Sequence, residues 1–138
     1  MNDYFKPSLT DDEIRNISSL GLAHVGDAVF ELLVRTWISQ NGKHTSGKMH
    51  RVAVGFVNAH AQAMFMEKLM PELTDEETTV FKRGRNAKVN SVPKNAEISD
   101  YHAATGLEAL LGYLYLRGRT ERINRLFQIM IKEYGDAS

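Results

Sequence analysis

LAHVGDAVFE, residues 22–31, is typical of a helix packed inside a domain, yet it carries an acid in its middle. The acid is Asp27, and its neighbours along the chain are almost all apolar. Burying a carboxylate is costly unless it is paired, hydrogen-bonded or bound to a cation. We therefore expect Asp27 to be buried and to have a specific partner.

A second apolar stretch has the same feature. TGLEALLG, residues 105–112, contains Glu108, which is the only Asp, Glu, Lys or Arg between Asp100 and Arg117. Two lone carboxylates on two apolar helices favour a divalent-metal site between them, because hard cations such as Mg²⁺ prefer oxygen ligands. The alternative is structural: each acid is satisfied by an arginine or by backbone amides.

Length and composition indicate one globular domain. The chain has 138 residues, of which 43% are hydrophobic and 25% charged, close to the average for folded domains. It has no cysteine, which excludes disulfides and thiolate metal sites and suits a reducing compartment. Neither a secretory signal nor an apolar run long enough for a membrane span is visible. We expect a cytoplasmic location.

No segment alternates with period two, so the sequence predicts an all-α fold. Gly55 is expected to separate a third helix from a fourth, and Ser99 or Asp100 to cap the helix that carries Glu108. After a short helix capped by Thr10, the expected helices cover roughly 20–40, 45–54, 57–70, 75–85, 99–118 and 120–135.

The formal net charge is zero, which argues against a general nucleic-acid binder, but the charges are unevenly distributed. Residues 32–66 and 78–96 contain no acid. The basic and polar side chains of these windows suit a phosphate backbone, although those near a helix end would also complement the helix dipole. The candidates for phosphate contact are Lys43, His44, Lys48, Arg83, Arg85, Asn86, Lys88 and Lys94. The stretch 86–98 has no usable period and is predicted to be a loop, which at this length is usually functional or disordered.

Several blocks together resemble a known family. Residues 22–31 are similar to the signature helix of the ribonuclease III catalytic domain, and residues 108–112 to its second acidic helix. The blocks KRGRNAK at 82–88, PKN at 93–95 and ATGLEALLGYLYL at 104–116 resemble the Mini-ribonuclease III branch, which lacks a double-stranded RNA-binding domain. The resemblance covers residues 20–134 of a single catalytic domain spanning residues 1–138.

The resemblance implies an all-α domain of about seven helices that forms a two-fold homodimer and cuts double-stranded RNA with Mg²⁺, for which Mn²⁺ can substitute. Asp27 and Glu108 match the family's catalytic metal ligands. The branch further suggests a large-subunit ribosomal RNA precursor as substrate. The two upstream acids of the longer ribonuclease III pattern fall here on Leu20 and Ala23, and the Asp before the second catalytic Glu is Thr105.

Two supporting residues are expected behind the metal ligands. Thr105, or a water, would fill the place of the missing Asp. Glu31 could orient a metal-bound water, but it lies four residues before Arg35 and could equally form an ordinary helix ion pair, which we favour. Two competing interpretations remain open: a non-catalytic helical module that binds RNA or the ribosome, and a metal-dependent phosphohydrolase of small substrates.

Overall fold

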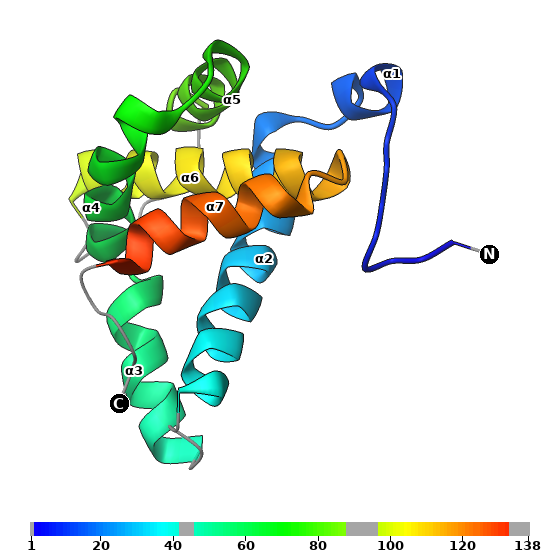
Figure 1. Ribbon diagram of the computed structural model, residues 1–138. Coiled ribbons are helices and arrows are strands. Elements are labelled where there is room, and N and C mark those ends of the chain that lie inside the picture. The colour runs from blue at the N-terminus through cyan, green and yellow to red at the C-terminus, as the bar shows by residue number, and fades with distance from the viewer. Residues whose placement is uncertain (1, 42–45, 88–96, 133–138) are drawn as a thin grey trace.

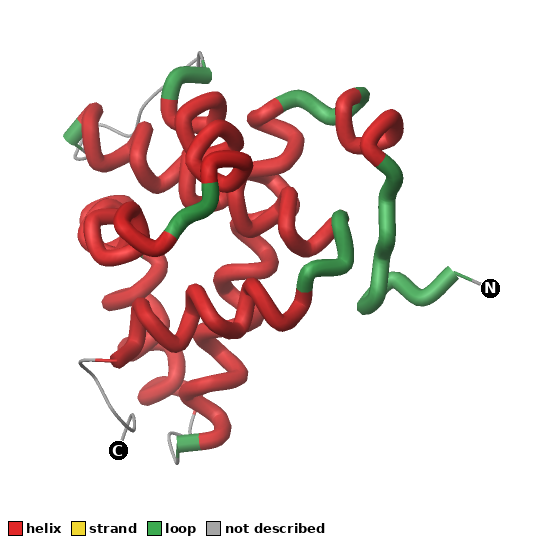
Figure 2. The backbone as a smooth tube through the Cα atoms, turned by 45° about the horizontal axis from the view of Figure 1, so that its top comes forward, coloured by secondary structure: helices red, strands yellow, loops and turns green. Residues whose placement is uncertain are grey.

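The computed structural model describes residues 2–41, 46–87 and 97–132, and this part of the chain is helical without strands (Figures 1 and 2). The predicted all-α fold of about seven helices is confirmed. A single 3₁₀ turn, η1, follows the fourth helix at Pro71. The helices are α1 (Asp11–Arg15), α2 (Ser19–Gln40), α3 (Ser46–Val57), α4 (Ala59–Leu69), η1 (Met70–Glu72), α5 (Asp75–Arg85), α6 (Ile98–Leu116) and α7 (Thr120–Ile131).

Helix α6 is the centre of the domain. It packs against α2, α4, α5 and α7, and in Figure 1 it runs through the middle of these helices. A helix that is apolar on all sides belongs inside a protein, and every residue from Ala104 to Leu114 is buried except Glu108. The residues of α6 that are fully enclosed include Leu107, Leu110, Leu111 and Leu114. Glu108 is therefore the one charged residue, and the one incompletely buried residue, in the middle of the central helix.

Local signals set most helix starts as expected. Thr10 and Thr74 each form a complete capping box, with Glu13 and Glu77 respectively. Ser18 caps α2 by accepting a hydrogen bond from the Gly21 amide. These caps satisfy amide groups that would otherwise lack partners at the helix ends.

Two expected boundaries are wrong. Gly55 does not end α3, which continues to Val57, and the break comes at Asn58, whose side chain caps α4. A glycine lowers helix propensity by only about 1 kcal/mol, so a good capping residue decides the boundary instead. Likewise α6 begins at Ile98 rather than after Ser99 or Asp100. The Asp100 carboxylate instead bonds His60 of α4 across 3.0 Å, measured from Oδ2 to Nδ1.

Helices α2 and α6 approach each other at two glycines. A Cβ on Gly26 would lie 1.6 Å from the backbone oxygen of Glu108, and one on Gly112 would lie 2.0 Å from the backbone oxygen of Leu22. The two backbones therefore touch where any other residue would hold them apart. This crossing decides which residues of α2 and α6 become neighbours.

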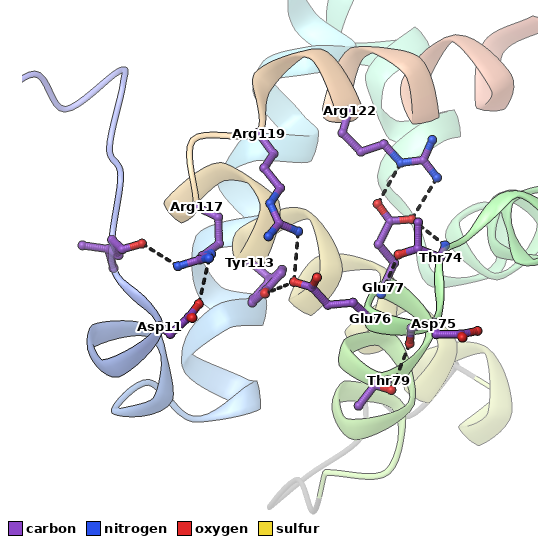
Figure 3. A network of polar contacts seen from close by, with 11 residues as sticks. Asp11, Thr74, Asp75, Glu76, Glu77, Thr79, Tyr113, Arg117, Arg119 and Arg122 are labelled. Carbon is purple, nitrogen blue, oxygen red and sulfur yellow. Dashed lines mark hydrogen bonds and ion pairs between the residues drawn. The ribbon is translucent and has the colours of Figure 1, made fainter.

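A polar network joins α5 to the end of α6 and the start of α7 (Figure 3). Arg122 donates to both carboxylate oxygens of Glu77, at 2.7 and 2.8 Å, and Glu77 is only 3% exposed. Glu76 accepts hydrogen bonds from the Tyr113 hydroxyl and from Arg119. Burial by itself would raise the pKa of Glu77, but the hydrogen bonds from Arg122 and the Thr74 amide hold that pKa below its ordinary value. The buried acid Glu77 and the exposed acid Glu76 are thus both paired with arginine.

Candidate active site

The α2–α6 crossing brings Asp27 and Glu108 together. Gly26 contacts the backbone of Glu108, and the next residue of α2 is Asp27. The two carboxyl groups lie close enough for a protonated Glu108 to hydrogen-bond Asp27. The sequence analysis expected these two acids, 81 positions apart (108 minus 27), to meet at a metal site between their helices, and the fold brings their side chains together.

One expectation about this pair is wrong: Asp27 is exposed, not buried. The buried face of α2 carries Leu22, Gly26, Phe30 and Val34, spaced by four, and Asp27 lies just beside that row. Glu108 is the acid that the fold shields from water, because it projects from the central helix. The apolar residues next to Asp27 in the sequence are therefore not a guide to the burial of the Asp27 side chain.

Glu108 holds its proton unusually tightly. Burial, the hydrogen bond with Asp27, and the negative charges of Asp27 and Glu31 raise the pKa of Glu108 from 4.5 to about 8. A hydrogen bond from Gln62 acts in the opposite direction. Within the described parts of the chain, neither Asp27 nor Glu108 forms an ion pair with a lysine or arginine, in contrast to Glu76 and Glu77. The alternative in which each of these two acids is paired with an arginine is therefore wrong for the described residues.

The residues present fit a hard divalent cation. Two neighbouring carboxylates, without a lysine or arginine partner among the described residues, offer the oxygen ligands that Mg²⁺ prefers. Among the described residues no group of three or more His, Cys, Asp or Glu side chains gathers, so these two acids are the charged ligands available. Mg²⁺ commonly uses one or two carboxylates and completes its coordination with waters and substrate phosphate.

Glu31 and Thr105 have other partners in this structure. Arg35 donates to Glu31 at 3.1 Å, which confirms the expected helix ion pair, and Glu31 is still close enough for its charge to act on Glu108. The Thr105 hydroxyl donates to the backbone oxygen of Tyr101, one turn back in its own helix. Their roles as supports of a metal site stay predictions.

Gln62 is the residue near the pair that the sequence analysis missed. It lies on α4, is 2% exposed, and its Nε2 donates to Oε2 of Glu108 at 3.4 Å. A glutamine on the buried side of a helix, beside Phe65 and Met66, is itself a signal, because an enclosed amide needs a partner. Gln62 and Glu108 both line a cavity of about 580 Å³ between α4 and α6.

The candidate RNA-contacting residues are only partly described. Arg83 and Asn86 are exposed near the end of α5, and Arg85 lies over the ring of Phe81. With Lys82, two of them line a hollow of about 650 Å³ against the start of α2. Lys43, His44, Lys88 and Lys94 lie outside the described residues, as does the side chain of Lys48.

The raised pKa of Glu108 makes the stability of the metal-free protein depend on pH. Between pH 4.5 and about 8 the folded state keeps a proton that the unfolded state loses, so stability falls as pH rises through this window and is level above it. We expect Glu108→Gln to remove this contribution and to be more stable than the wild type at pH 8, by roughly 1–3 kcal/mol after allowing for partial exposure.

The measurement is urea unfolding of both proteins in chelator at several pH values from 5 to 8.5. The difference in the free energy of unfolding should grow with pH. A difference that stays constant from pH 5 to pH 8 would contradict the assignment.

Comparison with known proteins identifies the class. Residues 20–119 match the model of the ribonuclease III domain, which covers both acidic helices. The chain belongs to the ribonuclease III family and is an endoribonuclease.

Within that family the curated relatives are named Mini-ribonuclease 3. The chain is 41% identical to the protein of Clostridium tetani, over 100% of this chain and 93% of the relative. It is 46% identical to that of Brevibacillus brevis, over 89% and 91% of the two chains. A crystal structure of a protein from Fusobacterium nucleatum superposes with a TM-score of 0.80 at 33% identity, covering 88% of this chain and 93% of the other. The predicted resemblance is thereby confirmed.

No helix in the described residues is long and apolar enough to cross a membrane.

Proposed function

We propose that this protein is a magnesium-dependent endonuclease of double-stranded RNA whose catalytic residues are Asp27 and Glu108. The observation that carries the proposal is the pair itself: two neighbouring carboxyl groups from α2 and α6 that have no lysine or arginine partner among the described residues. Family membership supports the enzyme over a non-catalytic helical module. An RNA substrate also fits better than a small phosphoester, since the exposed candidates Arg83 and Asn86 line a hollow separate from the cavity that Glu108 lines.

The acids act by holding the cation and by giving up a proton to do so. Glu108, whose pKa is raised to about 8, must lose its proton before both carboxylates can bind. When bound, Mg²⁺ would lower the pKa of a water and offset the charge that builds on the phosphate. Hydrolysis then places the hydroxyl of water on phosphorus and a proton on the 3′ oxygen. The products are a 5′-phosphate and a 3′-hydroxyl.

The rest of the chain would grip and orient the duplex. A-form RNA is recognised mainly through its shape, phosphates and 2′-hydroxyls, so the exposed basic side chains near the end of α5 suit its backbone. We propose a two-fold homodimer, which would place one pair of acids on each strand. Leu32 of α2 supports this, since a leucine side chain that is 57% exposed suits burial against a second copy. We further propose a large-subunit ribosomal RNA precursor as substrate and the cytoplasm as location.

The proposal is tested by incubating the pure protein with labelled substrates. Duplex RNA should be cut into 5′-phosphorylated products with Mg²⁺ or Mn²⁺, and a chelator should reduce the rate by at least about 100-fold because the acids then lack their cation. Single-stranded RNA, duplex DNA and nucleotides serve as comparisons. Cleavage of duplex RNA at the same rate in chelator would contradict the metal role.

Arg83 provides a separate test of the RNA contact. Neutralising one phosphate contact, as in Arg83→Ala, should weaken binding of different duplexes equally and reduce the slope of log Kd against log salt by about 1. Arg125→Ala on α7 is the matched control, since Arg125 is also exposed but lies outside the predicted RNA-binding set. Equal salt slopes for the wild type and both variants would remove Arg83 from the interface.

A further inference from the structure

Gln62 is an unusual residue for its place in the fold. It sits on α4 with 2% of its surface exposed, among side chains such as Phe65 and Met66 that belong to the core. An enclosed amide costs free energy unless it is hydrogen-bonded. Within the described chain, the hydrogen bond of this side chain runs from Nε2 to Oε2 of Glu108, over 3.4 Å.

Helix α4 meets α6 at two polar points that lie two residues apart on α4. His60 bonds Asp100 at 3.0 Å near the start of α6, and Gln62 reaches Glu108 two turns further along α6. Because His60 is exposed and Gln62 is enclosed, the first contact lies at the rim of the cavity between the helices and the second at its base. The position of Gln62 is therefore well determined by the packing of α4.

We propose that Gln62 is a positioning residue: its amide holds the Glu108 carboxylate toward Asp27, so that the two acids are arranged for a divalent cation before it arrives. This inference rests on the proposed function of the pair. Thr105 was expected to support the metal site, but its hydroxyl donates a hydrogen bond to the backbone oxygen of Tyr101. The support comes instead from a different helix.

The physical need for such a residue follows from charge. A glutamate side chain has several rotatable bonds, and once both acids are ionised their like charges favour turning Glu108 away from Asp27. An N–H donor bonded to Oε2 of Glu108 fixes the carboxylate in its present position and opposes that rotation, and the hydrogen bond becomes stronger and shorter when the acceptor carries a full charge. Groups that orient metal ligands in this way typically contribute 10- to 100-fold, roughly, to metal affinity or activity.

The test compares Gln62→Met and Gln62→Asn with the wild type. Methionine keeps the length and loses the donor, whereas asparagine keeps the amide but is one methylene too short to reach Glu108. Gln128→Met, at an exposed position of α7, is the control. We measure Mn²⁺ binding to the RNA-free protein by electron paramagnetic resonance, kcat and KM on duplex RNA at saturating Mg²⁺, and melting temperature.

Both Gln62 variants should bind Mn²⁺ about 10- to 100-fold more weakly and show a kcat about 10-fold lower, with KM for RNA unchanged. The control should match the wild type. Variants that melt earlier but keep wild-type Mn²⁺ affinity and kcat would overturn the inference, because Gln62 would then only fill space.

Asp27→Asn and Glu108→Gln, measured alongside, separate this inference from the proposed function. If they lose Mn²⁺ binding and cleavage while the Gln62 variants keep both, only the role of Gln62 is wrong. If they too bind Mn²⁺ and cut RNA like the wild type, the proposed site itself is wrong.

Discussion

Asp27→Asn and Glu108→Gln are each expected to reduce the rate of duplex RNA cleavage roughly 1,000-fold, equal to about 4 kcal/mol of transition-state stabilisation. Each change keeps the shape of the side chain and removes the negative charge that would hold the cation. Because the two acids act as one unit, the double variant should be little slower than either single variant. Single-turnover cleavage with Mg²⁺ in excess measures the effect.

Folding must be intact for this result to be informative. Asp27 is exposed, so Asp27→Asn should melt close to the wild type, and Glu108→Gln should melt at or above it near pH 8. Glu121→Gln, an exposed acid in the first turn of α7, is the matched control and should cut normally. Wild-type cleavage by a folded Asp27→Asn protein would show that the chemistry lies elsewhere.

Gly26→Ala is expected to destabilise the protein by about 3 kcal/mol or more, lowering the melting temperature by roughly 10 °C or more. The added Cβ would lie 1.6 Å from the backbone oxygen of Glu108, and a backbone atom cannot turn aside as a side chain can. The helices must separate, and the separation would also pull Asp27 from Glu108. Thermal unfolding followed by circular dichroism gives the stability, and the cleavage assay gives the effect on the site.

Gly55→Ala is the control for this change. A Cβ on Gly55, which lies within α3, would meet nothing within 4 Å, so alanine should stabilise the helix by about 1 kcal/mol. The same glycine-to-alanine substitution is thus expected to lower stability at Gly26 and to raise it at Gly55. Equal melting temperatures for Gly26→Ala and the wild type would show that the close crossing of α2 and α6 is not required.

Much of the fold could be predicted because its signals are local. The capping boxes at Thr10 and Thr74, and the apolar run that became α6, need only neighbouring residues to be recognised. One boundary failed because a local cap, Asn58, outweighed Gly55, and the other failed where His60, distant in sequence, bonded the carboxylate of Asp100. Gln62 was missed because its hydrogen-bond partner, Glu108, lies 46 positions away in the sequence.

By itself, the sequence determined the helical class, the two acids that stand out from apolar helices, and the family. These follow from periodicity, composition and motif order, which the chain carries along its own length. Tertiary structure alone decided that Asp27 is exposed, that Glu108 is the shielded partner, and that Gln62 contacts Glu108. The reason is physical: Gly26 and Gly112 let the backbones of α2 and α6 come into contact, and this helix crossing decides which side chains become neighbours.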